Sequence, residues 1–168
     1  MIRSLCLIGL LSAQAHALTI IDGNVTRELA PPEITAMRQH TINTKTIWIN
    51  DPVRHRFAGP RLSDLIRPVT KFVQVIGADG YGCTVTAEEI TRYQPILATS
   101  RDGKALPAQY APAWLIFPYP KTAQPDHPLH HKSVWQVVQI ESTGRDTGCT
   151  PGHVLAPARS AEAGAEFF

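Results

Sequence analysis

The sequence has no strong excess of charge and, beyond its first residues, no long apolar run. Its 168 residues include 16 Lys and Arg against 14 Asp and Glu, a formal net charge of +2. The basic residues form no cluster or helix face of the kind that binds nucleic acid. No apolar run after the N-terminus approaches the roughly 18 residues that a membrane-spanning helix needs. We therefore expect no nucleic-acid partner and no membrane insertion.

The N-terminus has the three parts of a secretory signal peptide. Arg3 precedes an apolar core at residues 5–11, and Ala15-His16-Ala17 is a small-residue cleavage site. We expect cleavage after residue 17, a mature chain that begins near Leu18, and a periplasmic location. Loss of Arg3 lowers the formal charge from +2 to +1. A buried N-terminal strand or helix is the alternative interpretation.

Cysteine is scarce. Cys6 lies in the predicted leader, which leaves Cys83 and Cys149. An even number of cysteines in an exported chain permits a disulfide. The alternative is a buried thiol at Cys83, on a strand face shared with Tyr81 and Val85, and an exposed thiol at Cys149. A catalytic Cys83 that works with a distant histidine is a third hypothesis.

Short β-rich runs alternate with brief helical segments, which is typical of an α+β fold. We expect one domain at residues 18–142 and a flexible tail at 143–168, where small and polar residues dominate. Thr86 and Glu89 form a capping box that starts a helix of about two turns. Strands are expected at residues 18–22 (at a sheet edge), 41–49, 72–76, 81–85, 114–117 and 134–140, and further short helices at 31–40 and 62–66.

Residues 96–118, ILATSRDGKALPAQYAPAWLIFP, have little conformational freedom. Gly103 supplies the positive φ that a turn after Asp102 requires, and Pro107 and Pro112 stiffen the loop before a buried strand at residues 114–117. Rigid loops beside buried strands often carry binding groups. We therefore expect the site near this segment.

This segment resembles the molybdopterin-binding domain of the sulfite oxidase family. In that family an LA pair, a G-x-x-L-P motif and a G-x-P-x-R-L-x-x-P run follow one another, as they do in part here. Two upstream segments fit the same pattern in the same order, GPRLSDLI at residues 59–66 and ADGY at residues 78–81. The resemblance covers roughly residues 41–140. It implies a single-domain sulfite-oxidase-like fold without the dimerisation domain, with a mixed β-sheet, a few short helices and long loops.

The chain departs from the family where the cofactor is held. The family's molybdenum-ligating cysteine lies before the segment that corresponds to GPRLSDLI, but residues 41–57 here contain no cysteine. The His and Arg that grip the cofactor's phosphate correspond to Gln109 or Tyr110 and to Trp114. A buried phosphate needs charged donors, whereas an unphosphorylated flat heterocycle favours aromatic surfaces. We expect a changed ligand and no metal.

Small exported members of this fold that lack the cysteine include proteins that bind a reduced pterin and report it to a membrane sensor. The resemblance implies that this chain is a periplasmic binding protein for a reduced, unphosphorylated, tetrahydropterin-like ligand. Its partner would be the periplasmic domain of a sensor of diguanylate cyclase, phosphodiesterase or kinase type. A pterin has a donor-rich edge that suits a carboxylate, here Asp79, and two flat faces that suit aromatic rings. The predicted ligand-binding residues are Trp48, Asp79, Tyr81, Gln109, Tyr110 and Trp114.

Two functions of other classes compete with this prediction. A molybdopterin-dependent oxidoreductase would hold its metal without a protein thiolate and would need a phosphate grip, for which Arg54 and Arg56 are the candidates. These two arginines flank His55. The alternative interpretation is that this charged run is a solvated loop without a ligand. A partner-binding domain without a small-molecule ligand is the third possibility.

Two further clusters are weaker candidates for chemistry. Asp126, His127, His130 and His131 could bind zinc or copper after export, but their spacing matches no closed metal site. Glu88 and Glu89 could form a catalytic carboxylate pair, but the capping box already explains Glu89.

Overall fold

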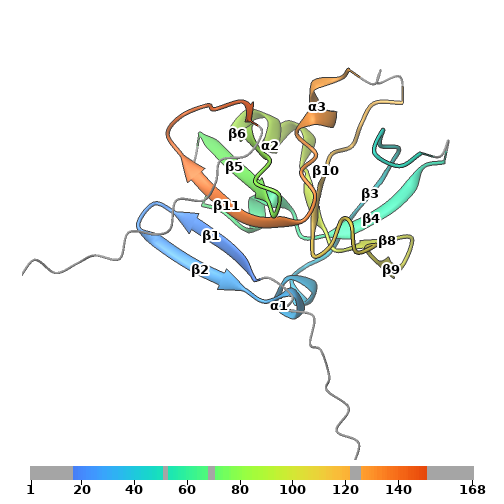
Figure 1. The fold of residues 1–168 in the computed structure, drawn as a ribbon, viewed down its shortest axis with the longest axis horizontal. Coiled ribbons are helices and arrows are strands. Elements are labelled where there is room, and N and C mark those ends of the chain that lie inside the picture. Colours follow the sequence, from blue (N-terminus) through green and yellow to red (C-terminus); the bar gives the residue numbers. More distant parts are fainter. Residues whose placement is uncertain (1–16, 51–52, 68–70, 122–125, 151–168) are drawn as a thin grey trace, which may run out of the picture.

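The computed structural model describes residues 17–50, 53–67, 71–121 and 126–150. These residues form many short strands and a few short helices (Figure 1), in agreement with the predicted α+β class. The predicted signal peptide falls on residues 1–17, of which 1–16 lie outside the described residues. No helix within the described ranges is long and apolar enough to cross a membrane.

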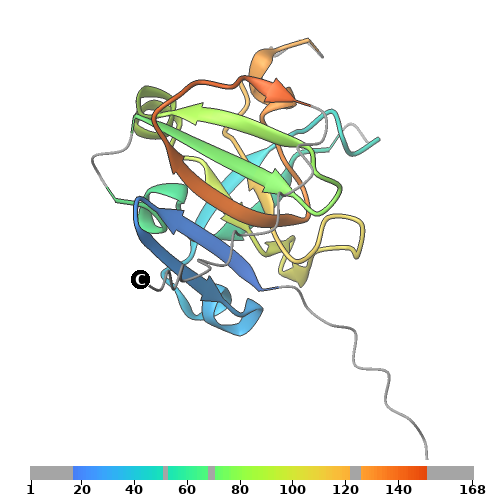
Figure 2. The same cartoon turned by 60° about the vertical axis from the view of Figure 1, so that its left-hand side comes forward.

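The largest element is a six-stranded sheet in the order β12-β6-β5-β11-β1-β2, which Figure 2 shows from top to bottom. Its strands are β1 (Leu18–Asp22), β2 (Val25–Leu29), β5 (Phe72–Gly77), β6 (Gly82–Thr86), β11 (Val137–Thr143) and β12 (Cys149–Thr150). β1 and β11 are parallel, and the other neighbours are antiparallel. The prediction that residues 18–22 form an edge strand is wrong, because β2 pairs with the outer side of β1.

Two smaller sheets complete the β-structure. The first contains β3 (His40–Thr44), β4 (His55–Gly59), β8 (Ser100–Arg101) and β9 (Lys104–Ala105), and the second pairs β7 (Ile96–Ala98) with β10 (Trp114–Ile116). The predicted turn at Asp102 and Gly103 is confirmed as the β8–β9 hairpin, with φ of 52° and 77° at these residues. The strand predicted at residues 41–49 ends at Thr44, so Trp48 lies in a turn after β3.

The helices are α1 (Pro31–Ala36), α2 (Ala87–Tyr93) and α3 (Pro128–His131), with one 3-10 turn, η1 (Leu62–Asp64). The predicted capping box is confirmed at α2. The Glu89 N–H donates to Thr86 Oγ1 at 3.1 Å, and the Thr86 N–H donates to Glu89 Oε2 at 2.9 Å. The helix predicted to reach residue 40 ends at Ala36, and β3 begins at His40.

β10 lies between two apolar cores. Leu115 belongs to the core of the six-stranded sheet, whereas Trp114 and Ile116 belong to a second core with Phe57 and Tyr110. Successive side chains of a strand point to opposite faces, and all three β10 residues are fully buried. One short strand therefore contributes to both cores and joins the two parts of the fold.

The end of the described chain corrects one prediction. Residues 143–150 do not form a loose tail: β12 pairs with β6, and Cys149 forms a disulfide with Cys83. Thr147 is held by the Thr84 hydroxyl at 2.8 Å. Thus the disulfide, which was one of three hypotheses, is present, and residues 151–168 lie outside the described residues.

Gly59 of β4 is required by a close backbone contact. A side-chain carbon at this position would overlap the backbone of Leu97 in β7. We predict that Gly59→Ala lowers the free energy of unfolding by about 3 kcal/mol, measured by urea denaturation. Gly144→Ala is the control, because nothing lies within 4 Å of its added carbon. Equal stability of the two variants would contradict this packing.

The disulfide should contribute substantially to stability. It links residues separated by 66 positions, for which restriction of the unfolded chain predicts a stabilisation of about 4 kcal/mol. We expect the Cys149→Ser variant to lose most of this stabilisation, as measured by urea denaturation. The wild-type protein in a reducing buffer should match the variant, and a variant as stable as the oxidised wild type would contradict the prediction.

Candidate functional site

A pocket of about 260 Å³ lies where the β5–β6 turn meets the segment after α3. We call it the aromatic pocket. Its lining residues come from three places: the turn after β3, the β5–β6 turn, and the end of α3 with the chain that leads from it to β11. They are Trp48, Asp79, Tyr81, His131, Ser133 and Trp135.

The β5–β6 turn positions the carboxylate of Asp79. The Gly77 N–H donates to the Tyr81 carbonyl at 2.8 Å, and Gly80 has the positive φ of 82° that the turn needs. Asp79 Oδ1 accepts from the Tyr81 N–H at 2.9 Å. No described donor contacts Oδ2, and the side chain is exposed at the pocket. One carboxylate oxygen is therefore fixed while the other is available to a ligand.

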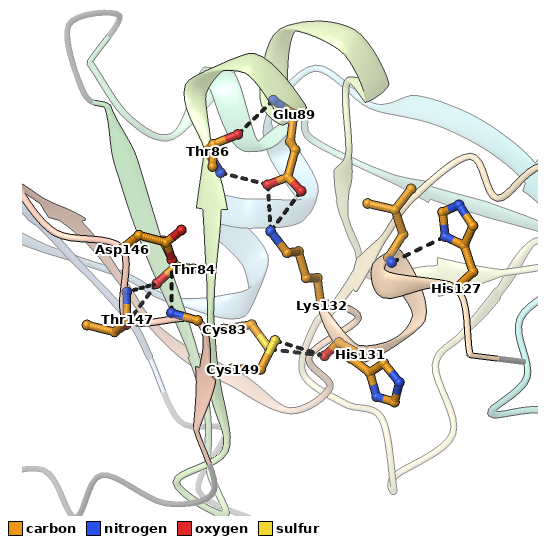
Figure 3. A network of polar contacts seen from close by, with 12 residues as sticks. Cys83, Thr84, Thr86, Glu89, His127, His131, Lys132, Asp146, Thr147 and Cys149 are labelled. Carbon is orange, nitrogen blue, oxygen red and sulfur yellow. Dashed lines mark hydrogen bonds and ion pairs between the residues drawn. A yellow bond between two sulfur atoms is a disulfide. The ribbon is translucent and has the colours of Figure 1, made fainter.

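The backbone carbonyl of His131 holds one side of the pocket in place. It accepts a hydrogen bond from the Tyr81 hydroxyl at 2.7 Å. It also lies 3.0 Å from Cys83 Sγ, as Figure 3 shows. A disulfide sulfur carries no proton, so the second interaction is a contact only. Burial, and then the charge of Asp79, raises the pKa of Tyr81. The hydroxyl thus keeps its proton and remains a donor.

Two tryptophan rings form the apolar part of the pocket. Trp48 and Trp135 meet edge to face, with centroids 5.1 Å apart and planes at 83°. Trp48 Nε1 donates to the His130 carbonyl at 3.0 Å, and the Trp48 carbonyl accepts from the Tyr110 hydroxyl at 2.9 Å. The indole N–H and the backbone carbonyl of Trp48 are therefore used within the protein, and its half-buried ring is held in one orientation.

Behind this wall lies a fully buried layer. Tyr110 stacks on Trp114 at 4.1 Å with an interplanar angle of 12°, and Trp114 is completely buried. Trp114 Nε1 donates to Ser133 Oγ at 3.0 Å, and this hydroxyl donates to the Leu115 carbonyl at 2.8 Å. This layer supports the pocket and leaves no face of Trp114 open to it.

Three of the six predicted ligand-binding residues, Trp48, Asp79 and Tyr81, line the aromatic pocket. Tyr110 and Trp114 lie behind it, and Gln109 is exposed and outside the lining. The predicted set omits His131, Ser133 and Trp135. None of these three lies near the motifs at residues 96–118, on which the prediction was based. The sequence marks Trp135 only as an aromatic residue close to a histidine-rich loop.

The other candidates for chemistry have structural partners. His55 Nδ1 lies 2.6 Å from Asp102 Oδ2, and the Arg56 N–H donates to Asp102 Oδ1 at 2.9 Å. Both hydrogen bonds lower the pKa of Asp102, and the bond from the Arg56 backbone N–H has the larger effect. Glu89 binds Lys132 at 2.7 Å in addition to its capping role (Figure 3). The described residues contain no group of three or more His, Cys, Asp or Glu arranged to hold a metal.

No protein family and no curated protein matches the sequence. Among solved structures, the chain is similar to the sulfane dehydrogenase SoxCD from Paracoccus pantotrophus, with a TM-score of 0.60 and 17% identity. The likeness covers 82% of this chain and 40% of the SoxCD chain. It shows the fold alone. That fold agrees with the sulfite-oxidase-like type that the motifs indicate.

His130 gives the protein a predicted pH dependence. Burial, followed by the charges of His127 and His131, lowers the pKa of His130 below its ordinary 6.5. The unfolded chain therefore binds a proton more readily than the folded one, so stability falls as the pH drops from about 6.5 through the lowered pKa. We expect urea denaturation between pH 7 and 5 to show this loss, and His130→Phe, which keeps a ring, to reduce it. An unchanged pH profile in the variant would contradict the assignment.

Proposed function

We propose that this chain is a periplasmic binding protein for a reduced, unphosphorylated pterin, which it reports to the periplasmic domain of a membrane sensor. The observation that carries the proposal is the aromatic pocket, where the carboxylate of Asp79 lies beside Trp48 and Trp135. A donor-rich ring needs both an acceptor and an apolar wall, and this pocket offers both.

The size of the pocket favours a small ring. Its volume of about 260 Å³ is below the range of about 300–1,000 Å³ that is common for drug-sized ligands. One bicyclic heterocycle suits such a space better than a dinucleotide or another long cofactor. A small side chain on the ring could extend through the open side.

The polar groups favour a ligand that donates hydrogen bonds. Asp79 offers a carboxylate oxygen, and the Tyr81 hydroxyl already donates to the His131 carbonyl. A pterin presents a ring N–H and an amino group along one edge, and hydrogen bonds from such donors to a charged carboxylate are stronger than neutral ones. The perpendicular tryptophan rings give one stacking face and one edge contact.

The residues present do not fit the molybdopterin cofactor of the sulfite oxidase family. Cys83 and Cys149, the cysteines within the described chain, are joined in a disulfide and so offer no thiolate. At the positions of the family's phosphate grip, Trp114 is buried in an apolar core and Gln109 is neutral and exposed. These features argue against the family's own way of holding molybdopterin. The alternative of a metal held without a thiolate is distinguished by measuring molybdenum in the purified protein.

Pterin affinity should depend on the charge of Asp79. Asp79→Asn keeps the acceptor for the Tyr81 N–H but removes the negative charge. We predict at least a tenfold weaker affinity for a tetrahydropterin, because hydrogen bonds to charged groups contribute about 1.5–3 kcal/mol. Anaerobic titration followed by tryptophan fluorescence measures this affinity.

Glu88→Gln is the matched control, since Glu88 is an exposed carboxylate outside the pocket. It should bind the pterin as the wild type does. Equal affinity of Asp79→Asn and wild type would contradict the role of the carboxylate. Absence of binding by the wild-type protein would favour a partner-binding domain without a ligand. For signalling, the isolated periplasmic domain of a sensor encoded nearby should bind the pterin-loaded and pterin-free forms with different affinities.

A further inference from the structure

A second pocket, next to the aromatic one, is lined by basic residues. We call it the basic pocket; its volume is about 460 Å³. The two pockets are neighbours, because Ile47 and His130 line the basic pocket while the residues that follow them in the chain, Trp48 and His131, line the aromatic one. The residues that bear on its chemistry are Lys45, Thr46, Ile47, Arg54, Lys121 and His130.

The charge of the basic pocket is unbalanced. Lys45, Arg54 and Lys121 carry positive charges, and its described lining contains no carboxylate. None of the three is ion-paired within the described chain, and the hydrogen bond from Arg54 goes to the neutral carbonyl of Asn43. Elsewhere, cations such as Lys132 and Arg67 have carboxylate partners, Glu89 and Asp22. The basic pocket thus concentrates positive charge that no described group neutralises.

A buried histidine adds a second, independent observation. His130 is 2% exposed, and no described group hydrogen-bonds to its Nδ1. Its ring is held by stacking on Tyr119 at 4.4 Å, and its backbone carbonyl is held by Trp48 Nε1. Buried polar atoms normally have partners, so the unpartnered Nδ1 of a histidine that lines a cationic pocket points to a missing ligand group. An oxyanion would accept a hydrogen bond from the Nδ1–H form.

We propose that the basic pocket binds a multiply charged oxyanion group of the phosphate type. The three cations would supply charge-assisted contacts from the open side, and His130 a fixed donor from the buried side. The group could come from free inorganic phosphate or from a phosphate carried by a molecule whose ring occupies the aromatic pocket. The assignment does not depend on the pterin proposal, because none of its residues lines the aromatic pocket.

The test is calorimetric titration of the mature, disulfide-bonded protein with inorganic phosphate at low ionic strength, with chloride as the competing salt. We expect phosphate to bind the wild type, and Lys45→Gln combined with Lys121→Gln to weaken binding at least tenfold. Arg92→Gln combined with Lys104→Gln is the matched control: it removes the same charge from exposed positions outside the pocket and should change affinity less than twofold. His130→Phe should also weaken binding at least tenfold while the ring and the fold are retained.

The outcomes separate the two sources of the anion. If phosphate binds equally well with and without a saturating unphosphorylated pterin, the basic pocket is a separate anion site. If a phosphorylated pterin binds at least tenfold tighter than the unphosphorylated one, and the lysine variant abolishes that advantage, one ligand spans both pockets. No phosphate binding to the wild type and no advantage for the phosphorylated pterin would overturn the proposal. Equal losses in the pocket and control variants would overturn it as well.

Discussion

The two-sided burial of β10 is the constraint on which the rest of the structure depends. Leu115 packs into the core of the six-stranded sheet, while Trp114 and Ile116 pack into the smaller core. Because the strand has side chains on both faces, neither core can shift without moving the other. Trp114 also fixes Ser133, so the same strand sets the position of the chain that carries His131 and Trp135 into the aromatic pocket.

The pocket itself is built from backbone groups as much as from side chains. The carbonyl of His131 accepts from Tyr81, and the carbonyl of His130 accepts from Trp48. Both carbonyls belong to α3, which thereby connects the β5–β6 turn to the turn after β3. The disulfide contacts the same His131 carbonyl and holds β12 beside β6. A rigid pocket of this kind loses little conformational entropy on binding a ligand, which favours affinity for a small ring.

Local signals in the sequence predicted local structure well. The capping box at Thr86, the turn at Asp102 and Gly103, and the β5, β6 and β10 strands follow from side-chain chemistry within a few residues. Long-range pairing could not be predicted in this way: the Cys83 to Cys149 bond and the inner position of β1 depend on strand order. The sequence predicted that the strand at residues 114–117 is buried, but not that its two faces belong to different cores. The strand predicted at residues 134–140 begins only at Val137, because Gln136, with a φ of 49°, interrupts it. Trp135 therefore lies in the segment before β11, where it lines the aromatic pocket.

We propose that this sulfite-oxidase-like fold holds a small ring without a metal. The most direct test is to export the protein into a bacterial periplasm, purify it anaerobically, denature it, and identify the released small molecules by mass and fluorescence. Molybdenum is measured on the same sample by elemental analysis. We expect a pterin in near-stoichiometric amount and no molybdenum. Molybdenum with a phosphorylated, dithiolene-bearing pterin would contradict it.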